Sequence, residues 1–196
     1  MVKAWLVSLF KLFLRNKRYA LLSLVAVAAL VLFTSQVKAF FIISLLGVTA
    51  TFSTFYKRVF QAPPAFELIT LTVVAVSIFY DPWIGALYAI VISISSEIAA
   101  QALDPFSITY IPPRMVAAFV APWLYGNGTG PVHNIAVLGL LMSLLYNALQ
   151  QPVYYYLTDV EKRIKSLYFS SLNIPLNFLI FKFLGEPLFE ILRSLA

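Results

Sequence analysis

The sequence contains no cysteine and only one histidine, His133. Without cysteine the chain has no disulfide, no thiolate nucleophile and no thiolate metal ligand. A single histidine with no acid beside it in the sequence is weak support for a metal or catalytic centre. No nucleophile–base pair and no metal-binding helix pattern is recognisable elsewhere. We therefore expect a protein that is not an enzyme and that holds no metal and no cofactor.

Charged residues are also scarce. They make up 11% of the sequence and hydrophobic residues make up 61%, whereas soluble domains are about a quarter charged and about half apolar. A chain of 196 residues cannot bury this apolar surplus in one core, so we expect lipid to be the solvent for much of its surface. The charges lie in short breaks between apolar runs, a pattern that orients helices in a membrane and argues against nucleic acid as a partner.

Seven apolar segments are long enough, or nearly so, to cross a bilayer as helices. They are residues 19–36, 39–56, 66–80, 82–103, 111–125, 131–156 and 166–184. We place the first break between them at residues 36–38. Another falls at Asp81-Pro82, a favourable helix start, because Asp caps free amides and Pro at the first position loses no hydrogen bond. We predict a single all-α domain, a polytopic membrane bundle of six to seven transmembrane helices.

Both ends of the chain are predicted to be interfacial amphipathic helices. Residues 1–18 carry five cations and no acid opposite an apolar face, as expected for a helix on an anionic cytoplasmic leaflet. The alternative is a signal-peptide start with residues 20–33 as its apolar core. Residues 185–196 form the second candidate helix. If the N-terminus is cytoplasmic and all seven segments cross, most cations lie inside, as the positive-inside rule requires of a multi-pass cell-membrane protein.

Glu97 lies within an apolar span, well before its end. An ionised carboxylate at membrane depth costs at least a few kcal/mol, so it needs a partner or a proton. Arg114, near the start of the next span, is the partner that we predict. The pair is either part of a ligand or proton site or an internal lock between two helices. Glu67, near a helix start, is interpreted as a residue stabilised by the helix dipole.

Small residues recur at helical spacing in the second span. Gly47 and Thr51 are four residues apart, as are Ala50 and Thr54. Membrane helices associate through such faces, because small side chains allow close backbone contact. The face either packs within the bundle or docks to a partner membrane subunit. A second group, at the polar and aromatic end of segment 131–156, includes Asn147 and either lines a cavity or forms an interfacial belt.

One stretch of the chain resembles the substrate-binding membrane subunits (S components) of energy-coupling factor vitamin transporters. Those proteins join two helices by a tight turn of the form Gly-Pro-x-x-Gly-Ala-x-x-Gly, with an acid further on. The matching residues here are Pro63-Pro64, Phe66-Glu67-Leu68, Asp81-Pro82-Trp83-Ile84-Gly85-Ala86-Leu87-Tyr88-Ala89 and Ile111-Pro112-Pro113-Arg114. Asp81 and Ala89 stand where the family has Gly, and Glu97 comes about one turn later than the family's acid.

The resemblance implies a six-helix core over residues 39–184 that binds a small vitamin-like molecule, has no catalysis of its own and depends on a partner subunit. The connections at 56–65, 103–111 and 157–166 would cover the ligand. Their cations favour an anionic ligand. The ligand-binding candidates are Arg114 as anchor, Glu97, Asn147 and Tyr110, and the partner-docking candidates are Gly47, Ala50, Thr51 and Thr54.

Two other functions stay open. Rod-shape morphogenesis membrane proteins share a similar short helical pattern, which suits a structural or accessory subunit of a larger membrane complex. The other alternative is a proton- or ion-coupled carrier that uses Glu97. Sidedness is open as well: the family's ligand loops face outward, but the charge count puts the same loops inside. Either segment 19–36 does not cross fully, or the core is inverted, or the likeness is architectural only.

Overall fold

The computed structural model describes residues 17–60, 66–103, 105–126 and 129–195. These residues are almost entirely helical and contain no strand, which confirms the all-α prediction for this part of the chain. Within these described ranges, four helices are long and apolar enough to cross a membrane: Gln36–Ser53, Pro82–Ala99, Ile135–Leu157 and Val160–Leu195. The basic helix predicted at residues 1–18 lies almost wholly outside the described residues.

The elements follow one another with short connections. In chain order they are α2 (Lys17–Ser53), α3 (Lys57–Phe60), α4 (Ile69–Phe79), α5 (Pro82–Ala99), η1 (Pro105–Tyr110), α6 (Ile111–Tyr125), α7 (Ile135–Leu157), α8 (Val160–Ile180), η3 (Phe181–Gly185) and α9 (Glu186–Leu195). Helices α4 to α7 fall on four of the predicted spans. α8 begins at Val160, six residues before its predicted span, because Asp159 caps it by accepting a hydrogen bond from the Lys162 amide.

The chain divides into two compact units, residues 1–42 and 43–196. The first unit, as far as it is described, consists of the N-terminal part of α2. The helix runs without interruption through residues 36–38, so the break predicted there is wrong. Gln36, Val37 and Lys38 are all tolerated inside a helix, and no Pro or Gly stops it. The number of times that segments 19–36 and 39–56 cross the bilayer stays a prediction.

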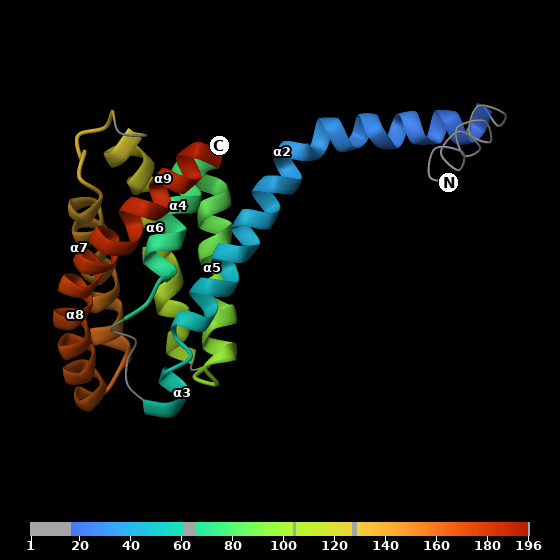
Figure 1. Cartoon of the computed structure of the whole chain (residues 1–196). Coiled ribbons are helices and arrows are strands. Elements are labelled where there is room, and N and C mark those ends of the chain that lie inside the picture. The colour runs from blue at the N-terminus through green and yellow to red at the C-terminus, as the bar shows by residue number, and fades with distance from the viewer. Residues whose placement is uncertain (1–16, 61–65, 104, 127–128, 196) are drawn as a thin grey trace. The chain divides into compact units, whose positions relative to one another are not determined.

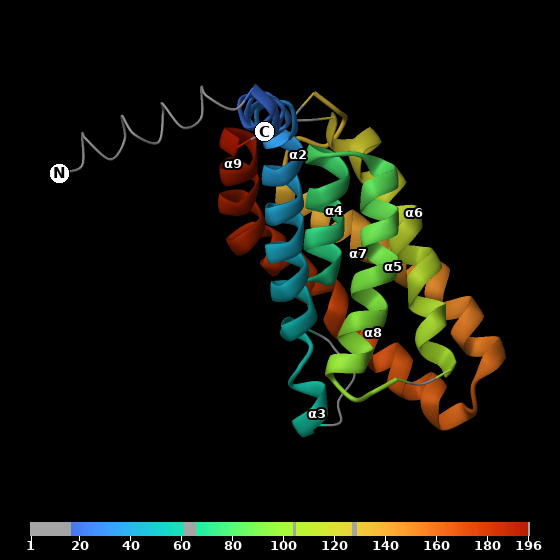
Figure 2. The same ribbon diagram turned by 90° about the vertical axis from the view of Figure 1, so that its right-hand side faces the viewer.

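The second unit is built around α4 (Figures 1 and 2). Every residue of α4 from Ile69 to Ile78 is buried, as expected for a helix that is apolar on all sides. Helices α5, α6 and α7 contact α4, and α8 packs mainly against α7. The core continues into the C-terminal part of α2 through Ala50, which is fully buried with Val73 and Ala89.

The turn between α4 and α5 is the tight connection that the sequence motif predicts. The Asp81 side chain accepts a hydrogen bond of 2.7 Å from the Trp83 amide, and Pro82 is the first helical residue. Gly85 lies directly against Ser77 of α4: a Cβ atom there would be 2.5 Å from the Ser77 Cβ. The glycine of the motif therefore allows close packing of α4 on α5 and has no direct part in a site.

The C-terminal end of the chain continues α8 without a break in the helix. The π-helical segment η3 joins α8 to α9, and its Phe181 fills a notch over Gly139 of α7. α9 buries Phe189 and Leu192, and the Phe189 ring packs edge-to-face on Tyr125 at 5.4 Å. α9 falls within residues 185–196, for which the sequence predicts an interfacial helix, and its position at a membrane interface stays a prediction.

Three connections gather at one end of the second unit. They join α2 to α4, α5 to α6 and α7 to α8, and they lie at the bottom of the bundle in Figures 1 and 2. The α4–α5 and α6–α7 connections lie at the opposite end. The three gathered connections are those that the resemblance to S components assigns to the ligand side.

Candidate functional site

Four charged side chains are buried near this end and form two ion pairs. The Lys57 Nζ lies 2.5 Å from the Glu97 Oε1, and the Arg114 Nη2 lies 2.6 Å from the Glu67 Oε2. None of the four residues is more than 8% exposed. The two cations and two anions cancel, so the cluster as a whole carries no net charge.

The predicted pairing of Glu97 with Arg114 is wrong. Lys57, the first residue of α3, follows the turn that ends α2, and from there it reaches the C-terminal part of α5. Glu67 directly precedes α4 and faces the start of α6, so it takes Arg114. The sequence analysis placed Lys57 in a connection between helices, and it interpreted Glu67 as an acid stabilised by the dipole of the following helix. The signal that could have corrected this is the rule that each buried acid needs its own partner.

The Arg114–Glu67 pair is extended by two hydroxyl groups. The Arg114 Nη1 donates a 2.9 Å hydrogen bond to the Ser93 Oγ of α5. The Thr70 hydroxyl donates a 3.1 Å hydrogen bond to the second Glu67 oxygen. One network therefore ties α4, α5 and α6 together, and its members hold the guanidinium in place from both sides.

Two tyrosines flank the same guanidinium. The Arg114 Cζ lies 5.9 Å from the centroid of the Tyr110 ring and 5.4 Å from that of the Tyr146 ring, within the range of cation–π attraction. Burial raises the pKa of Tyr110 above its usual value, so its hydroxyl stays protonated. Arg114 is therefore enclosed by an acid, a hydroxyl and two aromatic rings.

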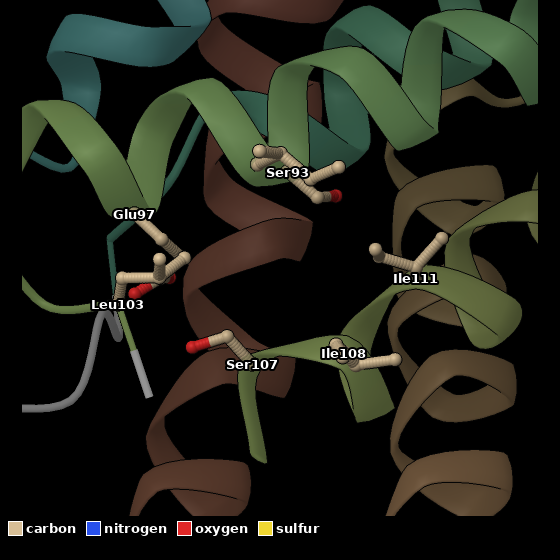
Figure 3. Close-up of a pocket in the computed structure, with 7 residues that line it drawn as sticks. Ser93, Glu97, Leu103, Ser107, Ile108 and Ile111 are labelled. Carbon is tan, nitrogen blue, oxygen red and sulfur yellow. The ribbon is translucent and has the colours of Figure 1, made fainter. Parts of the chain in front are cut away.

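A cavity of about 280 Å³ lies beside the cluster, between α5 and the η1–α6 segment. Its lining consists of Ser93, Ile94, Glu97, Leu103, Ser107, Ile108 and Ile111. Figure 3 shows the Glu97 carboxylate and the Ser107 hydroxyl on one side of this space and the side chains of Ile108 and Ile111 on the other. The cavity is thus apolar apart from one carboxylate and two hydroxyl groups.

The structure separates the predicted ligand-binding residues. Glu97 lines the cavity. Arg114 does not line it but lies behind it, joined to the lining through the Ser93 hydroxyl, and Tyr110 stacks on Arg114. Asn147 belongs elsewhere: its amide donates 2.7 and 3.2 Å hydrogen bonds to the Ser143 carbonyl and the Asn173 Oδ1.

Asn147 is part of a polar seam between α7 and α8 that the sequence reading missed. The Gln151 amide donates to the Ser166 and Ser170 hydroxyls, the first at 2.9 Å. Asn173 and Asn177 continue this face of α8 at helical spacing and are fully buried. Hydrogen bonds between polar side chains hold membrane helices together, so the seam accounts for the tight pairing of α7 with α8.

The small-residue face of α2 is occupied within the chain. Gly47 lies against Ile92 and Tyr88 of α5. Ala50 and Thr54 are fully buried, and Thr51 is half-buried. Packing inside the bundle therefore uses this face, and docking of a partner through the same residues stays a prediction.

Comparison of the chain with protein-family models, curated proteins and solved structures finds no match. Within the described residues, no group of three His, Cys, Asp or Glu side chains is placed to hold a metal ion.

Proposed function

We propose that this chain is the membrane-embedded binding subunit of an importer for a small vitamin- or cofactor-like molecule. The observation that carries the proposal is the cavity beside the buried charged cluster. Ligand sites are commonly concave and mostly apolar, with a few placed polar groups. The 280 Å³ cavity, with Glu97, Ser93 and Ser107 in an apolar lining, has this character.

The position of the cavity also supports binding. Its lining comes from α5, from the α5–α6 connection and from the start of α6, at the end where three connections gather. The Lys57–Glu97 pair joins the α2–α4 connection to the same lining. The cavity is therefore in contact with one connection through its lining and with a second through this ion pair.

A single crossing by α2, of which Gln36–Ser53 is the candidate span, would give the sidedness that this function requires. With a cytoplasmic N-terminus, the α2–α4 connection would then lie on the outer side. The α5–α6 and α7–α8 connections lie at the same end of the bundle and follow it. The ligand side then faces outward, as in the S components, and the energy for release would come from a partner subunit.

The alternative is a structural or accessory subunit without a ligand. The observation that favours it is the internal neutralisation of the four buried charges, which fixes the α2–α4 connection onto α5 and locks α4 to α6. In that case the cavity would be a packing defect without function.

Native mass spectrometry of the purified chain separates the two functions. Ile94 lines the cavity, whereas Ile98, one turn further along α5, is 59% exposed and does not. We compare the wild type with Ile94→Trp, which fills the cavity, and with Ile98→Trp, which adds the same bulk outside it.

The proposal expects a co-purified small molecule on the wild type and on Ile98→Trp, and its loss from Ile94→Trp. Uptake or growth of cells that depend on the protein should fail with Ile94→Trp only. A fully active Ile94→Trp with no change in bound mass would contradict the proposal and favour the accessory role.

A further inference from the structure

The cavity offers its ligand a hydrogen-bond acceptor and not a positively charged side chain. Arg114, the anchor expected for an anion, is not part of the lining and is already bonded to Glu67 and Ser93. Its Nε atom has no hydrogen-bond partner among the described residues, but that atom is buried. The ionisable side chain that reaches the cavity is Glu97.

Glu97 is held by one cation and also lines the cavity. Lys57 donates to its Oε1 at 2.5 Å, and the side chain is part of the cavity lining. The carboxylate is therefore the charged group nearest to a bound molecule. A carboxylate oxygen accepts hydrogen bonds and repels anions.

The rest of the cavity fixes the body of the ligand. Leu103 and Ile108 of its lining are 65% and 68% exposed, so the exposed part of the lining is apolar. A cavity of about 280 Å³ is at the small end of ligand pockets, which span roughly 300–1,000 Å³. A small, mostly apolar molecule therefore fits this space.

We propose that the cavity binds a small apolar molecule through a hydrogen-bond-donating end, a hydroxyl or an amine, which contacts the Glu97 carboxylate, and that it rejects carboxylates. This inference rests on the proposed function, because it names the ligand class of the same cavity. The sequence suggested an anionic ligand. This inference excludes an anion, because Lys57 and Arg114 are each already paired with an acid within the protein.

The test uses the full chain in detergent and three probes of similar size: 2-phenylethanol, its methyl ether and phenylacetate. The first donates a hydrogen bond, the second only accepts one and the third is an anion. Thermal unfolding is followed as each probe is titrated, and Ile94→Trp at the same probe concentration corrects for partitioning into the micelle.

We expect 2-phenylethanol to stabilise the wild type and Ile98→Trp but not Ile94→Trp. Its apparent Kd should be about tenfold lower than that of the ether, the value of a hydrogen bond to a charged acceptor. Phenylacetate should not stabilise any variant. In the double variant Lys57→Met/Glu97→Met, which removes both charges and the acceptor, the alcohol and the ether should bind equally.

Two results would overturn the inference in different ways. Binding of the ether or of phenylacetate as tight as that of the alcohol, and sensitive to Ile94→Trp, would refute the donor end but leave a ligand-binding cavity. If none of the probes stabilises the wild type more than Ile94→Trp, the cavity accepts no ligand of this class, and the proposed function loses its main support as well. The wild-type comparison of the probes decides the matter even if the double variant does not fold.

Discussion

Removal of the Glu67 carboxylate should destabilise the protein far more than removal of a similar carboxylate at the surface. In Glu67→Gln the Arg114 guanidinium remains buried, at 3% exposure, with its counter-ion gone. Breaking a buried ion pair in this way costs about 3–5 kcal/mol, because the remaining charge is neither solvated nor paired. The Thr70 hydroxyl retains an amide partner, so it adds little to the loss.

The chain provides a matched control. Lys165 and Glu161 also form a pair at 2.6 Å, but their side chains are 64% and 77% exposed. Because the two pairs have the same separation, they differ mainly in burial. Surface pairs contribute little to stability, so Glu161→Gln should leave the free energy of unfolding unchanged within error.

Reversible unfolding in mixed micelles of increasing SDS content measures these differences. The double variant Glu67→Gln/Arg114→Met, which removes both charges, should recover at least about 2 kcal/mol relative to Glu67→Gln, since replacement of a whole buried pair is often neutral. The reasoning is refuted if the double variant is as unstable as Glu67→Gln, or if Glu161→Gln is as costly as Glu67→Gln.

Three further predictions address packing, capping and sidedness. Gly139→Ala should lower the unfolding free energy by about 1–3 kcal/mol in the same assay, because its Cβ would lie 2.2 Å from the Phe181 Cγ; an unchanged value would mean that η3 does not fill this notch. Asp81→Ala should cost about 1 kcal/mol through loss of the cap on the Trp83 amide, and Asp81→Asn, which keeps an acceptor, should be near wild type. Glu161→Cys places a cysteine in a sequence that has none, and this residue should react with an impermeant maleimide on intact cells. Protection from the reagent until the cells are permeabilised would show that this end of the bundle faces the cytoplasm.

Most helices could be placed from the sequence because apolar runs end at residues that stop helices. α5 begins at Pro82 after the Asp81 cap, and α6 covers the whole predicted span from Ile111 to Tyr125. The interruption at residues 36–38 failed by the same logic, since polarity alone does not end a helix. Pro does not decide the matter either, since Pro122, Pro152 and Pro175 lie inside α6, α7 and α8.

The site was predicted less well, because proximity in the sequence is a poor guide to pairing between helices. Glu97 and Arg114 are on consecutive helices, yet each takes a partner from the α2–α4 connection or its end. Lys57 enters the core because the chain turns back after α2, which no local pattern shows. The polar seam was missed for a similar reason: Asn173 and Ser170 are informative only once α8 is known to face Asn147 and Gln151.

An experimental structure of the purified wild-type protein, determined in a lipid nanodisc without added ligand, tests the central claim most directly. The account predicts density that belongs neither to protein nor to lipid in the cavity between α5 and η1, within hydrogen-bond distance of the Glu97 carboxylate. A cavity that is empty, or one that is filled by a lipid acyl chain or closed by its own side chains, would contradict it.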